Sequence, residues 1–179
     1  MSKTMSRMQS SDSKTRFIKK ESHELGDRAE GLFILLAVKQ GWKVSASTRE
    51  QNIDEHWDYL IEKEDQVFKV EVKAEKRIER SDHDLQSKFI WVELRNVRGK
   101  VGWLFGKADL IAFEREKTFF FVKRLDLLAT VNQKVNLVAK VKSAKDALYK
   151  IYTREGRKDK VTLLPSHDVE SIQFMEWMK

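Results

Sequence analysis

The chain has 179 residues, 41% of them hydrophobic and 35% charged, which suits one folded domain with a charged surface. The absence of cysteine excludes disulfides, thiolate nucleophiles and cysteine-ligated zinc sites, and fits a cytoplasmic protein. The longest apolar stretch, Leu32–Val38, is too short to span a bilayer, and the charged N-terminus lacks the apolar region of a secretory signal.

The net charge of +7 comes mainly from two basic segments. Residues 1–20 hold six Lys or Arg and one acid, and residues 140–160 hold eight Lys or Arg and three acids. Because the first segment is polar and lacks apolar periodicity, we predict a disordered basic arm over 1–20 and one domain over 21–179. Two basic clusters around a more acidic middle favour a protein that holds a polyanion, and basic tails that aid solubility are the alternative.

Hydrophobic periodicity predicts the elements in chain order. Apolar residues at helical spacing after Ser22, with Gly41 as a cap, predict a helix of about sixteen residues. Strands are predicted at Trp42–Ser45, His56–Glu62, Gln66–Ala74, Phe89–Leu94, Val101–Phe105, Leu110–Phe113, Thr118–Val122, Tyr149–Thr153 and Val161–Leu164. Further helices are predicted at Leu125–Val138, Ala144–Lys150 and His167–Trp177. This order indicates an α+β fold, a single domain with a central mixed β-sheet flanked by helices.

The most informative feature is a predicted hairpin that carries two acids. If residues 63–66 close it, Asp58 lies directly across from Glu71, with Cβ atoms roughly 5 Å apart. A register slip would bring Asp54 or Glu55 into that place instead. Since side chains alternate along a strand, Lys73 shares the face of Glu71.

Two facing carboxylates repel each other, and a bound Mg²⁺ removes the repulsion. Lys73 would then place an ammonium beside the metal, where it can orient or deprotonate a water or offset charge on a phosphate. Asp58, Glu71 and Lys73 are therefore the candidate catalytic residues of a phosphodiester-hydrolysing site. The alternative is an ordinary surface ion pair between Glu71 and a neighbouring lysine, which would contribute about 0–1 kcal/mol.

Short motifs support the same chemistry. The segments Gly26–Glu30 and Gly41–Val44, followed by Asp58 and by Glu71–Lys73, resemble the core of PD-(D/E)XK nucleases, most closely that of archaeal Holliday-junction resolvases. Trp57 stands where that family usually has proline. After about residue 76 the sequence departs from the resolvases, and the later part resembles uncharacterised phage proteins.

The resemblance implies a restriction-endonuclease-like fold and cleavage of nucleic acid with Mg²⁺, for which Mn²⁺ can substitute. It implies that Glu30, Asp58 and Glu71 lie around the metal. It also implies that the backbone carbonyl of Val72 is a further metal ligand and that Lys73 is the catalytic lysine.

Five basic residues are candidates for binding nucleic acid. Arg77 and Arg80 follow the catalytic triplet closely. Arg154, Arg157 and Lys158 surround a glycine at a predicted hairpin tip, which would let that tip approach a phosphate backbone.

These features together predict a metal-dependent endo- or exonuclease whose partner is nucleic acid, DNA in the first instance. No base-reading element is apparent, which favours cleavage directed by structure or by ends rather than by sequence. A homodimer would suit cleavage of both strands. The alternative is a non-catalytic nucleic-acid-binding or regulatory protein that keeps the nuclease fold.

Overall fold

The first element of the computed structural model is a helix over residues 23–39, and the described residues are 23–79, 82 and 85–179. Ala29, Phe33 and Ala37 recur every four residues and are fully buried, so they form one apolar stripe. Gly41 follows with a φ of 82°, a left-handed conformation that glycine adopts without steric cost. The predicted helix and its glycine cap are confirmed, whereas the predicted arm of residues 1–20 lies outside the described residues.

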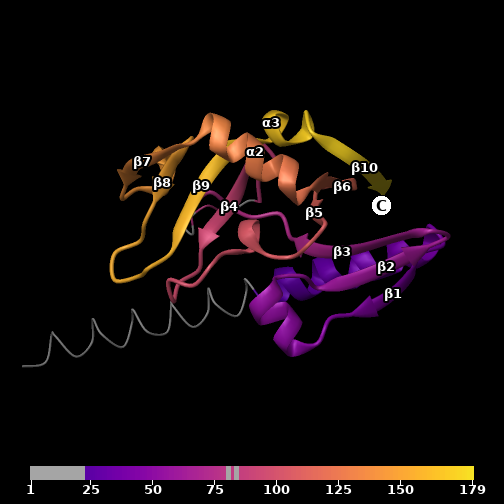
Figure 1. Cartoon of the computed structure of the whole chain (residues 1–179). Coiled ribbons are helices and arrows are strands. Elements are labelled where there is room, and N and C mark those ends of the chain that lie inside the picture. The colour runs from indigo at the N-terminus through magenta and orange to yellow at the C-terminus, as the bar shows by residue number, and fades with distance from the viewer. Residues whose placement is uncertain (1–22, 80–81, 83–84) are drawn as a thin grey trace, which may run out of the picture.

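Six strands form the larger sheet, in the order β1-β2-β3-β5-β6-β10 (Figure 1). They span Lys43–Ala46 (β1), Tyr59–Lys63 (β2), Gln66–Lys73 (β3), Leu110–Glu114 (β5), Thr118–Lys123 (β6) and Gln173–Met178 (β10). β3 and β5 are parallel and the other neighbours are antiparallel, so the sheet is mixed. The N-terminal helix covers one face, where Phe33 stacks on the rings of Tyr59 and Trp177.

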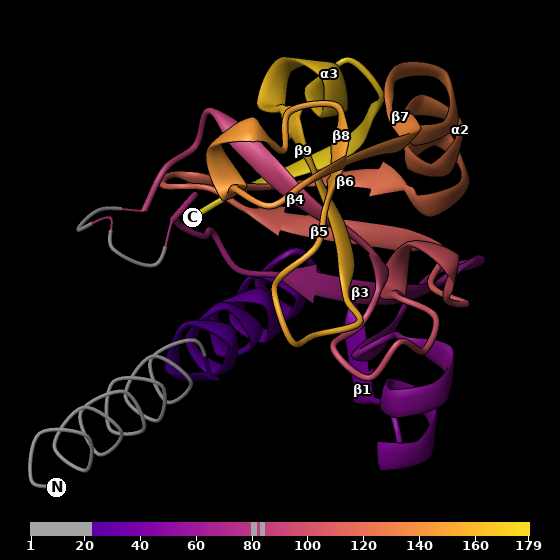
Figure 2. The same cartoon turned by 90° about the vertical axis from the view of Figure 1, so that its left-hand side faces the viewer.

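A four-stranded sheet covers the opposite face, in the order β4-β9-β8-β7 (Figures 1 and 2). Its strands span Phe89–Arg95 (β4), Asn136–Val141 (β7), Lys150–Tyr152 (β8) and Lys160–Pro165 (β9). The helices α2 (Arg124–Lys134) and α3 (Ser166–Glu170) accompany this sheet. Val92, Phe113 and Leu127 bring β4, β5 and α2 into one shared core.

This architecture confirms an α+β fold in one compact unit with a mixed sheet at its centre. The prediction that helices flank that sheet holds for one face only, because a second sheet occupies most of the other face. The restriction-endonuclease-like classification stays a prediction.

Two predicted elements, one of them an apolar run, are short turns in the structure. The predicted strand Val101–Phe105 is a 3₁₀ turn over Trp103–Phe105 (η2), and the predicted helix Ala144–Lys150 reduces to a 3₁₀ turn over Ala144–Asp146 (η3). Gly102 lies so close to β4 that a Cβ there would sit 2.5 Å from a backbone oxygen. A short apolar run does not reveal such a contact, because turns and strands bury similar residues.

Two predicted helices end early and are followed by strands. Helix α2 stops within the predicted span Leu125–Val138, and β7 follows it. Likewise, α3 occupies only the start of the predicted span His167–Trp177, and β10 follows it. In both places pairing with another strand overrides the local pattern: β7 pairs with β8, which follows shortly after it in the sequence, and β10 pairs with the distant strand β6.

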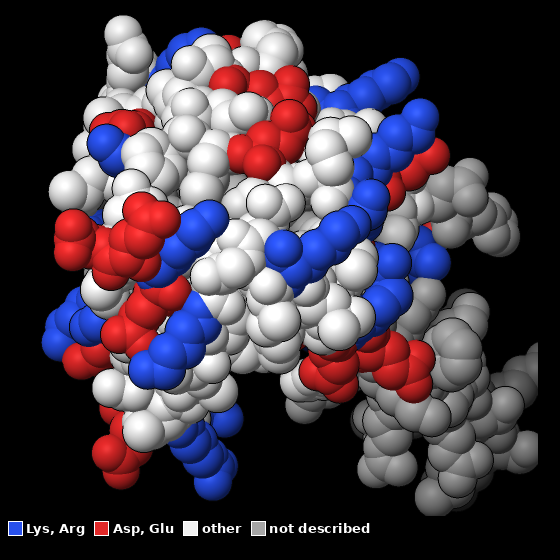
Figure 3. Space-filling model, turned by 90° about the vertical axis from the view of Figure 1, so that its right-hand side faces the viewer, with Lys and Arg blue, Asp and Glu red and all other residues white. Residues whose placement is uncertain are grey.

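In the part of the chain that the structure describes, no helix is both long and apolar enough to cross a membrane. The surface carries charges of both signs. On the face shown in Figure 3, Lys and Arg side chains lie beside Asp and Glu side chains. The basic excess is therefore interrupted by acids on that face.

Candidate active site

The β2–β3 hairpin places Asp58 across from Glu71. Tyr59 pairs with Val70, and the backbone N–H of Asp58 donates to the carbonyl of Val70 over 2.8 Å. One step further along this antiparallel ladder, Asp58 faces Glu71. The predicted register is confirmed, with Glu64 at the turn in a left-handed conformation (φ 53°).

Two donors orient the Asp58 carboxylate. Its Oδ2 accepts from the backbone N–H of Val72 over 2.7 Å, and its Oδ1 accepts from Nδ2 of Asn52 over 2.6 Å. Asn52 lies in a π-helical turn, η1 (Gln51–Glu55), that precedes β2. Asn52 was not predicted from the sequence, where its only signal is a place in a polar loop shortly before Asp58.

Glu71 and Lys73, the other two candidate catalytic residues, form an ion pair. Lys73 Nζ donates to Oε1 of Glu71, whose side chain is 8% exposed. The same ammonium lies 5.4 Å from the ring centroid of Trp103, at a distance where a cation is attracted to the aromatic face. Strand alternation therefore brings the predicted acid and lysine together.

The electrostatics of the centre follow from burial and from this pairing. Burial, and then the charge of Glu71, raises the pKa of Asp58 to about 7, although Lys73 and the Val72 N–H oppose the rise. Burial alone would lower the pKa of Lys73, but the charges of Glu71 and Asp58 outweigh it and raise that pKa. Lys73 is thus an ammonium at neutral pH.

Glu30 has a different environment. Its Oε2 accepts from the hydroxyl of Tyr59 over 2.9 Å, and Tyr59 belongs to the core under the N-terminal helix. The charge of Glu30 contributes to the raised pKa of Asp58, but less than burial and Glu71 do. The structure thus joins Glu30 to Tyr59 and joins Glu71 to Lys73. The metal-binding role of Glu30, like that of the Val72 carbonyl, stays a prediction.

Asp58 and Glu71 fit a divalent cation as a two-carboxylate site. The two carboxylates repel each other because burial removes the water that would screen their charges, and a bound cation would relieve this repulsion. Mg²⁺ is commonly held by one or two carboxylates, with water completing its coordination shell. Among residues 23–79, 82 and 85–179, no group of three or more acidic or histidine side chains is arranged around a common metal position. The fit therefore rests on these two residues.

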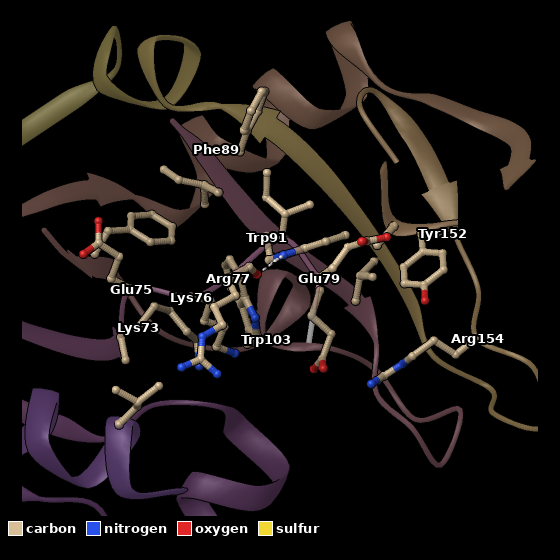
Figure 4. A pocket seen from close by; sticks show the side chains of 18 of the residues that line it. Lys73, Glu75, Lys76, Arg77, Glu79, Phe89, Trp91, Trp103, Tyr152 and Arg154 are labelled. Atoms are coloured by element: carbon tan, nitrogen blue, oxygen red, sulfur yellow. Dashed lines mark hydrogen bonds between the residues drawn. The ribbon is translucent and has the colours of Figure 1, made fainter. Parts of the chain in front are cut away.

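A cleft of about 1330 Å³ opens beside Glu71 and Lys73. Its walls come from the end of β3, from the segment that follows β3, and from the four-stranded sheet. Figure 4 shows Lys73, Arg77, Trp91, Trp103 and Arg154 around it. Glu71 lines this cleft, whereas Asp58 is not among the lining residues. A phosphate chain in the cleft would meet cationic and aromatic side chains next to Glu71 and Lys73.

The predicted nucleic-acid-binding residues do not all lie in one place. Arg77, Arg154 and Arg157 line the cleft. Lys158 is exposed, but its side chain packs against Gly99 at another turn. Arg80 lies outside the described residues.

Arg154 is held by a buried acid. Its Nε donates to Oδ2 of Asp159 over 2.6 Å, and the Asp159 side chain is 1% exposed. Since a guanidinium has five N–H donors, Arg154 can keep this pairing and still contact a phosphate.

Other polar residues near the site serve the fold. Glu55, the alternative ligand, accepts from Nε1 of Trp57 and from Lys107, and these hydrogen bonds lower the pKa of Glu55 to about 2. Gln86 exchanges hydrogen bonds with the backbone of Phe89. Neither side chain is directed to the pair of facing carboxylates.

The chain was also compared with known proteins. No family model matches it, and neither a curated protein nor a solved structure matches it.

Proposed function

We propose that this protein is a metal-dependent nuclease that hydrolyses phosphodiester bonds, in DNA in the first instance. One observation carries the proposal. Asp58, the residue directly before β2, faces Glu71 of β3, and the ammonium of Lys73 contacts Glu71 beside a cleft with cationic walls. Paired carboxylates with an adjacent lysine suit phosphoryl chemistry, because the carboxylates hold a cation while the lysine stabilises developing negative charge.

In this proposal Asp58 and Glu71 would hold Mg²⁺ or Mn²⁺. When bound, the metal would polarise the phosphate and lower the pKa of a coordinated water. Asn52 and the Val72 N–H keep the Asp58 carboxylate in place. Lys73 retains its proton and donates to a phosphoryl oxygen or orients the attacking water.

The pairing of Lys73 with Glu71 also favours a second candidate. An ion pair already neutralises Glu71, and no third carboxylate or histidine joins the two acids in the described part of the chain. A non-catalytic nucleic-acid-binding protein could keep Glu71 and Lys73 as a structural pair. It would bind through the cationic cleft and would be indifferent to metal.

A cleavage assay with Mg²⁺ or Mn²⁺ separates the two candidates. The substrates are single-stranded, duplex, flap and four-way-junction DNA, together with RNA. Lys73→Met keeps the length of the side chain but removes its charge, and is expected to reduce cleavage by about 100-fold or more. Lys69→Ala is the matched control, since Lys69 lies on the same face of β3 but pairs with Glu55 outside the cleft.

Cleavage that Lys73→Met abolishes and Lys69→Ala preserves would support the nuclease. Cleavage of none of the substrates by the wild type, with nucleic-acid binding that is unchanged in Lys73→Met, would favour the binding protein instead. Titration of Mn²⁺ into wild type and Glu71→Gln provides a readout that does not depend on activity. The nuclease is expected to lose metal binding with that substitution.

A further inference from the structure

The cleft-facing side of β4 carries an aromatic surface. Ile90 and Val92 point into the core and are at most 5% exposed. The alternate residues Phe89, Trp91 and Glu93 point the other way and line the cleft. Trp91 is half-buried, with one side open to the cleft.

The ring of Trp91 in β4 lies next to the ring of Tyr152 in β8, although β9 separates the two strands in the sheet. Their centroids are 5.9 Å apart and their planes are inclined by 40°. Nε1 of Trp91 donates to the carbonyl of Arg77 over 3.1 Å, which holds the indole in one orientation (Figure 4). Both side chains line the cleft that contains Lys73. The rings are thus held in place by the protein and accessible to a ligand.

Cationic side chains surround the rings. Those lining the cleft beyond Lys73 include Lys76, Arg77, Lys142, Arg154 and Arg157.

Several acids of the cleft are neutralised by cations that lie outside its walls. Glu114 binds Arg28 and Lys179 over 2.8 and 3.0 Å, and Glu79 binds Lys145 over 3.2 Å. Two cations of the cleft are paired with outside acids in the same way, Arg154 with Asp159 and Arg115 with Glu170. The excess of positive charge is therefore that of the lining itself, in which seven Lys or Arg stand against five Glu among the described residues.

We infer that this cleft binds an unpaired nucleic-acid strand, with bases stacked on Trp91 and Tyr152 and phosphates contacted by the surrounding cations. Aromatic rings read the flat faces of bases, which are accessible in a single strand and hidden inside a duplex. A surface for duplex binding would need cations alone, and the ring pair would then contribute nothing. The inference deepens the proposed nuclease, since it names the unpaired strand as the substrate that reaches Lys73.

Binding is tested in EDTA, so that it is measured without cleavage. Fluorescence anisotropy of a labelled oligothymidylate gives the Kd for a single strand, and a labelled duplex and an RNA strand are compared with it. Trp91→Leu removes the ring and is expected to weaken single-strand binding about 10-fold, which corresponds to about 1.4 kcal/mol. Trp91→Phe also loses the N–H group but keeps a ring, so its Kd is expected to stay within about 2-fold of the wild type.

Two controls separate stacking from a general loss of structure. Phe174→Leu alters an aromatic residue that is 40% exposed and is not part of the cleft, and it is expected to leave the Kd unchanged. Quenching of tryptophan fluorescence on binding should diminish in Trp91→Phe, because the quenched indole is then absent. Tyr152→Leu should weaken binding in the same direction as Trp91→Leu.

Tighter binding of the single strand than of the duplex, lost in Trp91→Leu and kept in Trp91→Phe, would support the inference for DNA. The same pattern with RNA alone would support it with RNA as the ligand. Equal affinity for strand and duplex, or a Trp91→Leu variant that binds like the wild type, would overturn it. These results are independent of the nuclease proposal, because no metal or cleavage is needed to obtain them.

Discussion

Asp58→Asn is expected to stabilise the folded protein at alkaline pH and to change its stability little at acid pH. Burial and the charge of Glu71 raise the pKa of Asp58 from 3.8 to about 7. Between these two values the folded state binds more protons than the unfolded state, so ionisation of Asp58 lowers the free energy of unfolding as the pH rises. Asparagine cannot ionise, so the variant escapes this loss.

The magnitude follows from the size of the pKa shift. A shift of about three units at 1.36 kcal/mol per unit gives about 4 kcal/mol as an upper bound. Since Asp58 is only partly buried, and solvent screens its charge, about 2 kcal/mol is expected. Nearly all of it should be present above about pH 7 and absent below about pH 4.

Urea denaturation in EDTA at about pH 4 and about pH 8 gives the free energies of unfolding. The quantity of interest is the difference between Asp58→Asn and the wild type at each pH, which removes the contribution of other titrating groups. Asp65→Asn is the matched control, because Asp65 is exposed at the turn of the same hairpin. A difference that does not grow between the two pH values would refute the desolvated pairing of Asp58 with Glu71.

A second arm repeats the urea denaturation without EDTA and with metal. Mn²⁺ added at about pH 8 should raise the stability of the wild type by binding the folded state. Asp58→Asn should show little of this gain, since it lacks one of the two carboxylates.

Three further substitutions test the fold that carries the site. The Asp168 side chain is buried, with 4% of the residue exposed, and burial by itself would raise its pKa. Hydrogen bonds to its carboxylate outweigh burial and lower that pKa, and the hydrogen bond from Lys134, over 2.5 Å, has the largest effect among them. Asp168→Asn should therefore cost about 2–3 kcal/mol near neutral pH, and this difference should shrink as the pH falls below about 4, as urea denaturation would reveal. Gly102→Ala places a Cβ 2.5 Å from the backbone oxygen of Glu93 and should lower the free energy of unfolding by about 1–3 kcal/mol. A Cβ at Gly26 meets nothing within 4 Å, so Gly26→Ala should stabilise the N-terminal helix by about 0.5–1 kcal/mol. Thermal melts should show a lower melting temperature for the first variant and a higher one for the second.

The predicted site and the proposed chemistry depend on a short stretch of sequence. Strand alternation over Gln66–Lys73 determines that Glu71 and Lys73 share a face. A turn at residues 63–66 then determines that Asp58 lies opposite Glu71. Both relations are local, because a two-strand hairpin of fixed register needs no information from the rest of the chain. They could therefore be derived from the sequence.

Contacts between distant segments could not be derived in this way. The end of the predicted helix after His167 became the strand β10, since β6, which lies far away in the sequence, offered backbone pairing. One local contact was also missed, because Asn52, only six residues before Asp58, reaches it through an irregular turn that has no sequence signature. Alternation shows that β4 has two faces but does not show which of them is covered, so the sequence does not place Trp91 at the cleft.

The sequence by itself thus determined the N-terminal helix, the β2–β3 hairpin and the grouping of Asp58, Glu71 and Lys73. Only the tertiary structure decided that a second sheet covers the larger one, and that its outer aromatic face forms a wall of the cleft beside Lys73. The reason is physical. Periodicity and turn chemistry act over a few residues, whereas the packing of two sheets depends on the burial of side chains from strands separated by many tens of residues.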